Sequence, residues 1–232
     1  MTTFDPETAE IKFAIADAAT DLFVEGDGHF LIKDVANTVG IDPADVFNYF
    51  PNKQAILQFY YTAIIYRYRL MIDEIDHFDS YTLSEKLSNF AYASFDMLDE
   101  KKAFVEDTFQ NLILRSCSRT DFEMETEELL RQLLEDDPRL PASSSVLMND
   151  IFYAFLRNKY LGLIRFRLSD TSEDYELTME LTDKLTTFLQ ELMYSSVLDR
   201  GFELGKFLYA NRENFLCEIP VVKQIFSKIE IR

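Results

Sequence analysis

Apolar residues recur at steps of three and four along almost the whole chain, and this spacing limits most strongly what the chain can fold into. Such a period fits one face of an α-helix, whereas a half-buried β-strand requires strict alternation of apolar and polar residues. No segment keeps that alternation, and only six glycines and six prolines are available for turns in 232 residues. A β-rich fold needs more turns than these can supply. We therefore predict an all-α protein.

Glycine, proline and capping residues divide the chain into predicted helices. The first helix is expected to begin at Pro6, a favoured first helical position, and to end before Gly26. A short helix over 32–39 is expected to stop at Gly40, because glycine readily adopts the left-handed conformation that ends helices. Further helices are predicted over about 44–49, 53–75, 82–98, 101–117, 122–135, 146–168, 172–198, 200–212 and 220–230.

Residues 30–57, FLIKDVANTVGIDPADVFNYFPNKQAIL, predict a helix-turn-helix unit. Such a unit needs small or apolar residues where its helices cross, and glycine where the turn is left-handed. Ala36, Gly40 and Val46 meet these needs. In DNA-binding proteins the second helix of the unit, here about 44–49, lies in the major groove.

The same region resembles the N-terminal domain of the TetR family of transcriptional repressors. That family shows an AA…LF ending to its first helix, an IA…G turn, a Tyr-x-x-Phe recognition helix and a lysine shortly afterwards. The corresponding residues here are Ala18, Ala19, Leu22, Phe23, Val35, Ala36, Gly40, Ile41, Phe47, Asn48, Tyr49, Phe50 and Lys53. The match covers about residues 6–60, and the rest of the chain matches in architecture. The resemblance implies a helix-turn-helix domain over 1–52 and a ligand-binding and dimerisation domain over 53–232.

The resemblance implies a ligand-responsive transcriptional regulator, expected to be a repressor, that binds operator DNA as a homodimer. The candidate DNA contacts are Lys33, Ala44, Asp45, Phe47, Asn48, Tyr49 and Lys53. The regions 146–168 and 172–198 are unusually apolar, and the resemblance implies that they form a four-helix dimer interface.

Many aromatic residues follow residue 80, and helical bundles often hold ligands in cavities between their helices. For any one of these residues, ordinary core packing is the simpler interpretation. As a group they are also consistent with a cavity for a small apolar or aromatic effector. The candidate lining residues are Phe90, Phe95, Phe109, Phe152 and Phe155.

The expected DNA side departs from the family pattern. Leu31 stands where the family usually has a phosphate-contacting threonine, and Phe47 stands in place of the recognition-helix tyrosine. Residues 1–60 hold three basic and ten acidic residues, a formal charge of −7. DNA-binding proteins gain much of their affinity by neutralising phosphates. The alternative is therefore a TetR-fold dimer that has lost DNA recognition and binds a small molecule or a protein.

Several of the candidate residues also have a purely structural interpretation. Carboxylates near a helix N-terminus stabilise the helix, and this role is favoured for Asp42 and Asp45 over contact with bases. A solvated surface position is favoured for Lys33. For Lys53, a phosphate contact and a solvated helix start remain equally open.

No catalytic motif is visible in the sequence, so we do not expect an enzyme or a cofactor. Two histidines at unrelated spacings, His29 and His77, do not predict a metal site. No apolar run approaches the length of a membrane-spanning helix, and the sequence MTTFDPETAEIK does not look like a signal peptide. We therefore expect a cytoplasmic protein without membrane partners. Its net charge of −18 opposes non-specific attraction to nucleic acid.

Overall fold

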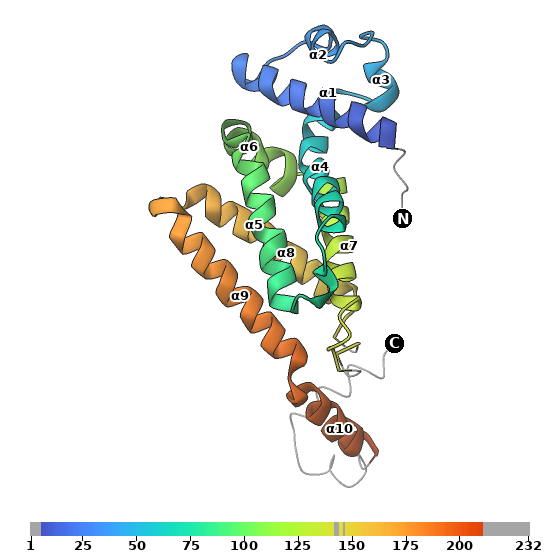
Figure 1. Cartoon of the computed structure of the whole chain (residues 1–232), viewed down its shortest axis with the longest axis vertical. Coiled ribbons are helices and arrows are strands. Elements are labelled where there is room, and N and C mark those ends of the chain that lie inside the picture. The colour runs from blue at the N-terminus through green and yellow to red at the C-terminus, as the bar shows by residue number, and fades with distance from the viewer. Residues whose placement is uncertain (1–5, 142–143, 146, 211–232) are drawn as a thin grey trace.

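The computed structural model describes residues 6–141, 144–145 and 147–210, and these residues form helices joined by turns without any strand (Figure 1). The prediction of an all-α fold is confirmed. The predicted helix over 220–230 lies outside the described residues. The α-helices are α1 Pro6–Glu25, α2 Ile32–Val39, α3 Val46–Tyr49, α4 Lys53–Asp73, α5 Leu83–Asp99, α6 Lys102–Phe109, α7 Asp121–Glu135, α8 Asp150–Ser169, α9 Glu176–Tyr194 and α10 Ser196–Ala210.

Helices α1, α2 and α3 lie together at one end of the molecule, and α4 leads from them into the remaining helices (Figure 1). Helix α2 ends at Gly40, which has φ of +80° and donates its backbone N–H to the carbonyl of Ala36. Regular helix in α3 begins only at Val46, two residues later than predicted. The reason is a tight turn, in which the carboxylate of Asp42 accepts the N–H of Ala44 at 2.8 Å.

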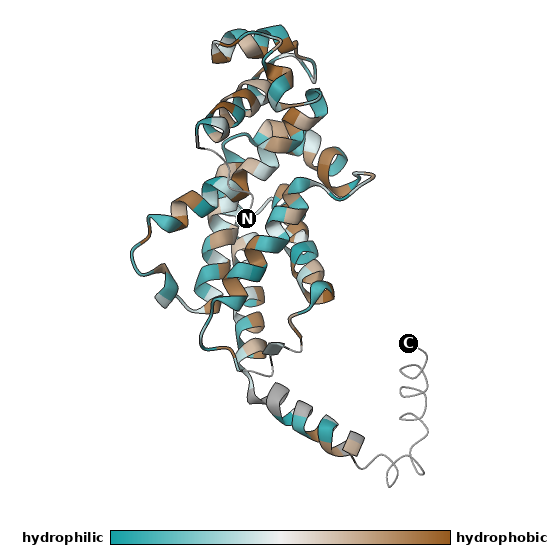
Figure 2. Cartoon of the chain, turned by 90° about the vertical axis from the view of Figure 1, so that its right-hand side faces the viewer, coloured by the Kyte–Doolittle hydropathy of each residue, from teal (hydrophilic) through white to brown (hydrophobic). Residues whose placement is uncertain are grey.

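Helices α4, α5, α7, α8 and α9 form the bundle, in which α4 packs on α5 and α7, α5 packs on α9, and α7 packs on α8. Reciprocal capping bonds mark the starts of two of them, with Thr82 and Glu85 at α5 and Thr120 and Glu123 at α7. Helix α10 extends away from the bundle beyond the end of α9 (Figures 1 and 2). In the part of the chain that the structure describes, no helix combines the length and the apolar character needed to cross a bilayer.

The predicted helix over 101–117 is divided in the structure. Helix α6 ends at Phe109 and is followed by a π-helical turn, η2, over Gln110–Leu114. The backbone N–H of Arg115 donates to the carbonyl of Gln110, five residues earlier, at 3.0 Å. Apolar residues continue at helical steps through this turn, so the sequence gives no sign of the change.

Asp170 organises the connection between α8 and α9. One of its carboxylate oxygens accepts hydrogen bonds from the backbone and hydroxyl of Ser172, at 2.9 and 2.6 Å. The other accepts from the backbone and hydroxyl of Thr178, at 2.8 and 2.5 Å. These bonds, with those from the Ser172 hydroxyl the most important, hold the pKa of Asp170 well below its usual value.

Replacing Asp170 with Asn is expected to lower the melting temperature more at pH 7 than at about pH 2.5. Since the pKa of Asp170 is lower in the folded chain than in the unfolded chain, its stabilising contribution is complete above about pH 4 and is lost as the pH falls further. Thermal melts followed by circular dichroism between pH 7 and about pH 2.5 measure this. A difference between the two proteins that is constant over the whole range would contradict it.

Candidate functional site

The α2–α3 surface carries most of the candidate DNA contacts. Val35, Ala36 and Val46 are buried in the core, and α2 packs on α1, which leaves the polar positions of α2 and α3 outside. Phe47 is 56% exposed. The other candidates that are exposed on these helices or on the turn between them are Lys33, Ala44, Asp45 and Asn48.

Tyr49 and Lys53, the other two candidate DNA contacts, both contact other parts of the same chain. Tyr49 is half-buried and lines a hollow of about 330 Å³ between the end of α3, α4 and the start of α7. The ammonium group of Lys53 donates to the carbonyl of Phe30 and lies 5.0 Å from the centre of the Phe30 ring. Lys53 therefore links α4 to the loop that precedes α2, although its side chain is also exposed to solvent.

The two acidic residues of the turn have different roles. Asp42 accepts the backbone N–H of Ala44 within the turn that precedes α3. Asp45 makes no capping bond, and its carboxylate accepts instead from the side-chain amide of Asn48 at 3.2 Å. The α2–α3 surface thus exposes Asp34, Asp42 and Asp45 against one basic residue, Lys33. The acidic character read from the sequence persists on the surface that would face DNA.

The bundle contains an apolar cavity of about 180 Å³ between α5, α7, α8 and α9. Phe90, Phe152 and Phe155 line it, as predicted. Phe95 and Phe109 lie outside it. The Phe95 ring lies 4.9 Å from the guanidinium of Arg167, and the Phe109 ring lies 5.7 Å from that of Tyr61, so both belong to the core.

None of the α9 residues that line this cavity was among the predicted candidates. The apolar residues of α9 repeat at helical steps within the apolar region 172–198, so the sequence indicated that they face inward. That spacing does not indicate which side chains they contact. The lining residues that were not among the candidates include Leu130, Leu185, Phe188, Leu189 and Leu192.

Helices α8 and α9 leave six large apolar side chains exposed, and Gly162 of α8 is exposed among them. We call this surface the α8–α9 face and define it by Ile151, Phe155, Gly162, Phe166, Leu177, Phe188 and Leu192. Large exposed apolar patches are uncommon on monomers and are typical of interaction sites.

A comparison with protein families matches residues 86–208 to the model of the Tetracyclin repressor-like, C-terminal domain. This is more than half of the chain and includes the helices that form the cavity and the α8–α9 face. The chain belongs to the TetR family. A comparison with curated proteins found no match.

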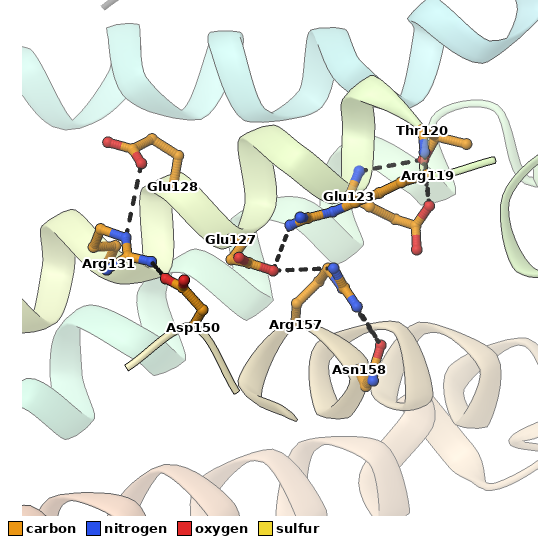
Figure 3. Close-up of polar contacts among 9 residues, drawn as sticks. All are labelled: Arg119, Thr120, Glu123, Glu127, Glu128, Arg131, Asp150, Arg157 and Asn158. Carbon is orange, nitrogen blue, oxygen red and sulfur yellow. Dashed lines mark hydrogen bonds and ion pairs between the residues drawn. The ribbon is translucent and has the colours of Figure 1, made fainter. Parts of the chain in front are cut away.

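In this TetR-family chain, ion pairs join α7 to α8 and to Arg119, which precedes α7 (Figure 3). Glu127 of α7 is buried, and its carboxylate binds both Arg119 and Arg157, the latter at 3.0 Å. Arg157 also donates to the side chain of Asn158 at 3.2 Å. We assign these ion pairs a structural role, because the carboxylate of Glu127 and the two guanidinium groups are already paired with one another. Among the residues described, no three His, Cys, Asp or Glu side chains gather as metal ligands would.

Proposed function

We propose that this TetR-family protein is a ligand-responsive transcriptional repressor that binds operator DNA as a homodimer. The proposal rests on one observation. Helix α4 connects an exposed helix-turn-helix to a bundle that contains an apolar cavity. We assign residues 1–52 to DNA binding and residues 53–232 to ligand binding and dimerisation. The candidate DNA contacts are those of the α2–α3 surface, with Lys33 and Asn48 as the best hydrogen-bond donors.

Helix α4 supplies a path from the cavity to the helix-turn-helix. The cavity is lined from α5 and α7, and α4 packs on both of these helices. A small apolar or aromatic effector that favours one arrangement of α5 and α7 would therefore move α4 and the helices at its start. In a dimer this changes the separation of the two recognition helices, which must match successive major grooves.

The α8–α9 face supports the dimer. Two helices from each subunit would bury it in a four-helix interface, and two-fold symmetry is the commonest arrangement of homo-oligomers. The resulting protein needs neither a cofactor nor a catalytic residue.

A gel-shift measurement with the promoter DNA beside the protein's own gene, at low salt, tests the proposal. We expect a shifted band at protein concentrations well below about 1 μM, because specific complexes have dissociation constants of about 10 nM or tighter. Replacing Lys33 with Ala should weaken binding and reduce the salt dependence by about one phosphate contact. Absence of a shifted band at micromolar protein would contradict DNA binding.

A second candidate function rests on the acidity of the α2–α3 surface. Asp34, Asp42 and Asp45 face outward there, and phosphates repel carboxylates. In this alternative the TetR-fold dimer has lost DNA recognition and binds a small molecule, or a basic protein, instead. A dimer that binds an apolar compound but shifts no DNA at low salt would favour it.

A further inference from the structure

The hollow beside Tyr49 lies where the N-terminal helices meet the bundle, and we call it the α3–α7 hollow. Its volume of about 330 Å³ lies within the range of about 300–1,000 Å³ that is usual for small-molecule sites. Its walls come from Lys12 of α1, residues 49–51 at the end of α3, residues of α4, and residues 116–121 at the start of α7. No described residue lines both this hollow and the apolar cavity of the bundle, so the two are separate.

The wall formed by α4 contains a buried threonine whose hydroxyl has no partner. Thr62 lines the hollow and is only 3% exposed, and within the described part of the chain its hydroxyl makes no hydrogen bond. Buried polar groups are almost always hydrogen-bonded, because leaving one unpaired costs free energy. The hydroxyls of Tyr49, Ser116 and Ser118 also line the hollow, and none of them bonds to a described residue. The hollow therefore offers four hydroxyl groups to a bound molecule.

Two basic side chains place positive charge at the hollow. The ammonium of Lys12 lies 5.4 and 5.3 Å from the ring centres of Phe50 and Phe59. Aromatic faces attract cations, so these rings hold the charge at the wall. The guanidinium of Arg119 pairs with Glu127 (Figure 3), but it has five N–H donors and its side chain is 44% exposed. Arg119 can therefore bind a second anion.

The charge balance of the lining favours an anionic ligand. Lys12 and Arg119 stand against one acidic lining residue, Asp121, which leaves a net charge of +1 in a protein whose net charge is −18. Asp121 is exposed, so water screens its repulsion of an anion.

The remaining wall of the hollow is apolar and favours an organic molecule over a small inorganic ion. The rings of Phe50 and Phe59 lie 5.2 Å apart, edge to face, and both are almost completely buried. Pro51 and Ala55 extend this wall. An inorganic anion would leave these side chains uncovered, whereas a ligand with an apolar body would remove their surface from water.

We propose that the α3–α7 hollow binds a small organic carboxylate with an apolar or aromatic body. The carboxylate pairs with Lys12 and Arg119 and accepts the hydroxyl of Thr62, while the apolar body packs on Phe50 and Phe59. Such a ligand contacts the end of α3 and the start of α7 together, and so bridges the helix-turn-helix and the bundle. This second site differs in chemistry from the bundle cavity and does not depend on the proposed DNA binding.

Isothermal titration calorimetry with 3-phenylpropionate and its uncharged analogue 3-phenylpropionamide tests the inference. The two probes have nearly the same size and differ in charge. Lys12→Met removes the ammonium and keeps an unbranched apolar side chain beside the rings. Lys184→Met is the matched control, because Lys184 is an exposed lysine of α9 outside the hollow. Leu189→Trp narrows the bundle cavity and shows whether the probe binds there instead.

We expect 3-phenylpropionate to bind with a dissociation constant of about 1 mM or tighter, which is ordinary for a ligand of this size. The amide should bind at least about tenfold more weakly, and Lys12→Met should weaken binding of the acid by a similar factor, because hydrogen bonds to charged groups are the stronger ones. Lys184→Met and Leu189→Trp should match the wild type.

A second pair of variants covers the case in which Lys12→Met does not fold. Ser118 is exposed in the loop before α7 and lines the hollow, so Ser118→Asp adds a carboxylate there and Ser118→Asn adds a neutral group of the same shape. Ser118→Asp should bind the acid at least about threefold more weakly than Ser118→Asn, because like charges repel.

Three results would overturn the inference. Wild-type protein that binds no 3-phenylpropionate at millimolar concentrations would show that the hollow is not a site for this class. Equal affinities for the acid and the amide would show that the basic side chains do not select the ligand. Loss of binding in Leu189→Trp, with binding retained in Lys12→Met, would place the probe in the bundle cavity. The gel shift of the protein without any probe tests the proposed function separately from all three.

Discussion

Replacing Phe104 with Ala is expected to lower the free energy of unfolding by about 3–5 kcal/mol, the usual cost of removing a fully buried aromatic side chain. Phe104 lies on α6 and is fully buried. Its ring lies 5.6 Å from the ring of Phe23 on α1, edge to face, and 5.2 and 5.8 Å from the rings of Tyr60 and Tyr61 on α4.

The loss is expected to be large because this contact joins three helices. Tyr61 is fixed from a second side by a hydrogen bond of 2.7 Å to the hydroxyl of Thr108, so the surrounding side chains cannot easily collapse into the space. Urea denaturation followed by circular dichroism measures the change. Phe47→Ala is the matched control, since the same truncation at a half-exposed ring should cost no more than about 0.5 kcal/mol. Equal effects of the two substitutions would contradict the packing described here.

Replacing Glu127 with Gln is expected to cost about 2–3 kcal/mol, because it leaves a nearly buried guanidinium without its charged partner. The side chains of Glu127 and Arg157 are both only 12% exposed. Arg119 would lose the same carboxylate (Figure 3). The value is below that for a completely buried pair, because some water reaches both side chains.

The neighbouring Glu128 provides the control for this substitution. Its carboxylate is half-exposed and lies 4.0 Å from the guanidinium of Arg131, so Glu128→Gln should change stability by no more than about 0.5 kcal/mol. Both variants remove one negative charge from adjacent positions on α7, and thus the net charge is the same in each. Equal free energies of unfolding for the two variants in urea denaturation would show that the ion pairs of Glu127 do not stabilise the fold significantly.

Short-range signals predicted the helices of the N-terminal region closely. Gly40 ends α2 because the left-handed turn is a local requirement, and the predicted and observed ends agree. The start of α3 was predicted less well, because the bond between Asp42 and Ala44 delays regular helix by two residues. The start of α8 was placed too early, since Asn149 caps the helix by accepting the N–H groups of Ile151 and Phe152.

The cavity shows what such signals cannot provide. Phe90 and Phe95 lie on the same helix and both are buried, but only Phe90 lines the cavity. Their environments differ because Phe90 stacks on Tyr160 of α8, with ring centres 4.6 Å apart, while Phe95 meets Arg167. Seventy residues separate Phe90 from its partner. Helical spacing can mark both residues as internal without indicating what each of them contacts.

The sequence by itself determined the all-α class, the helix-turn-helix and the acidity of its surface, since periodicity, a left-handed turn and charge depend only on neighbouring residues. Only the tertiary structure decided which aromatic side chains surround the cavity, that Lys53 binds the carbonyl of Phe30, and that the cavity opens at the α8–α9 face. The physical reason is that these features depend on how helices distant in the chain pack, and a pattern within one helix carries no information about its neighbours.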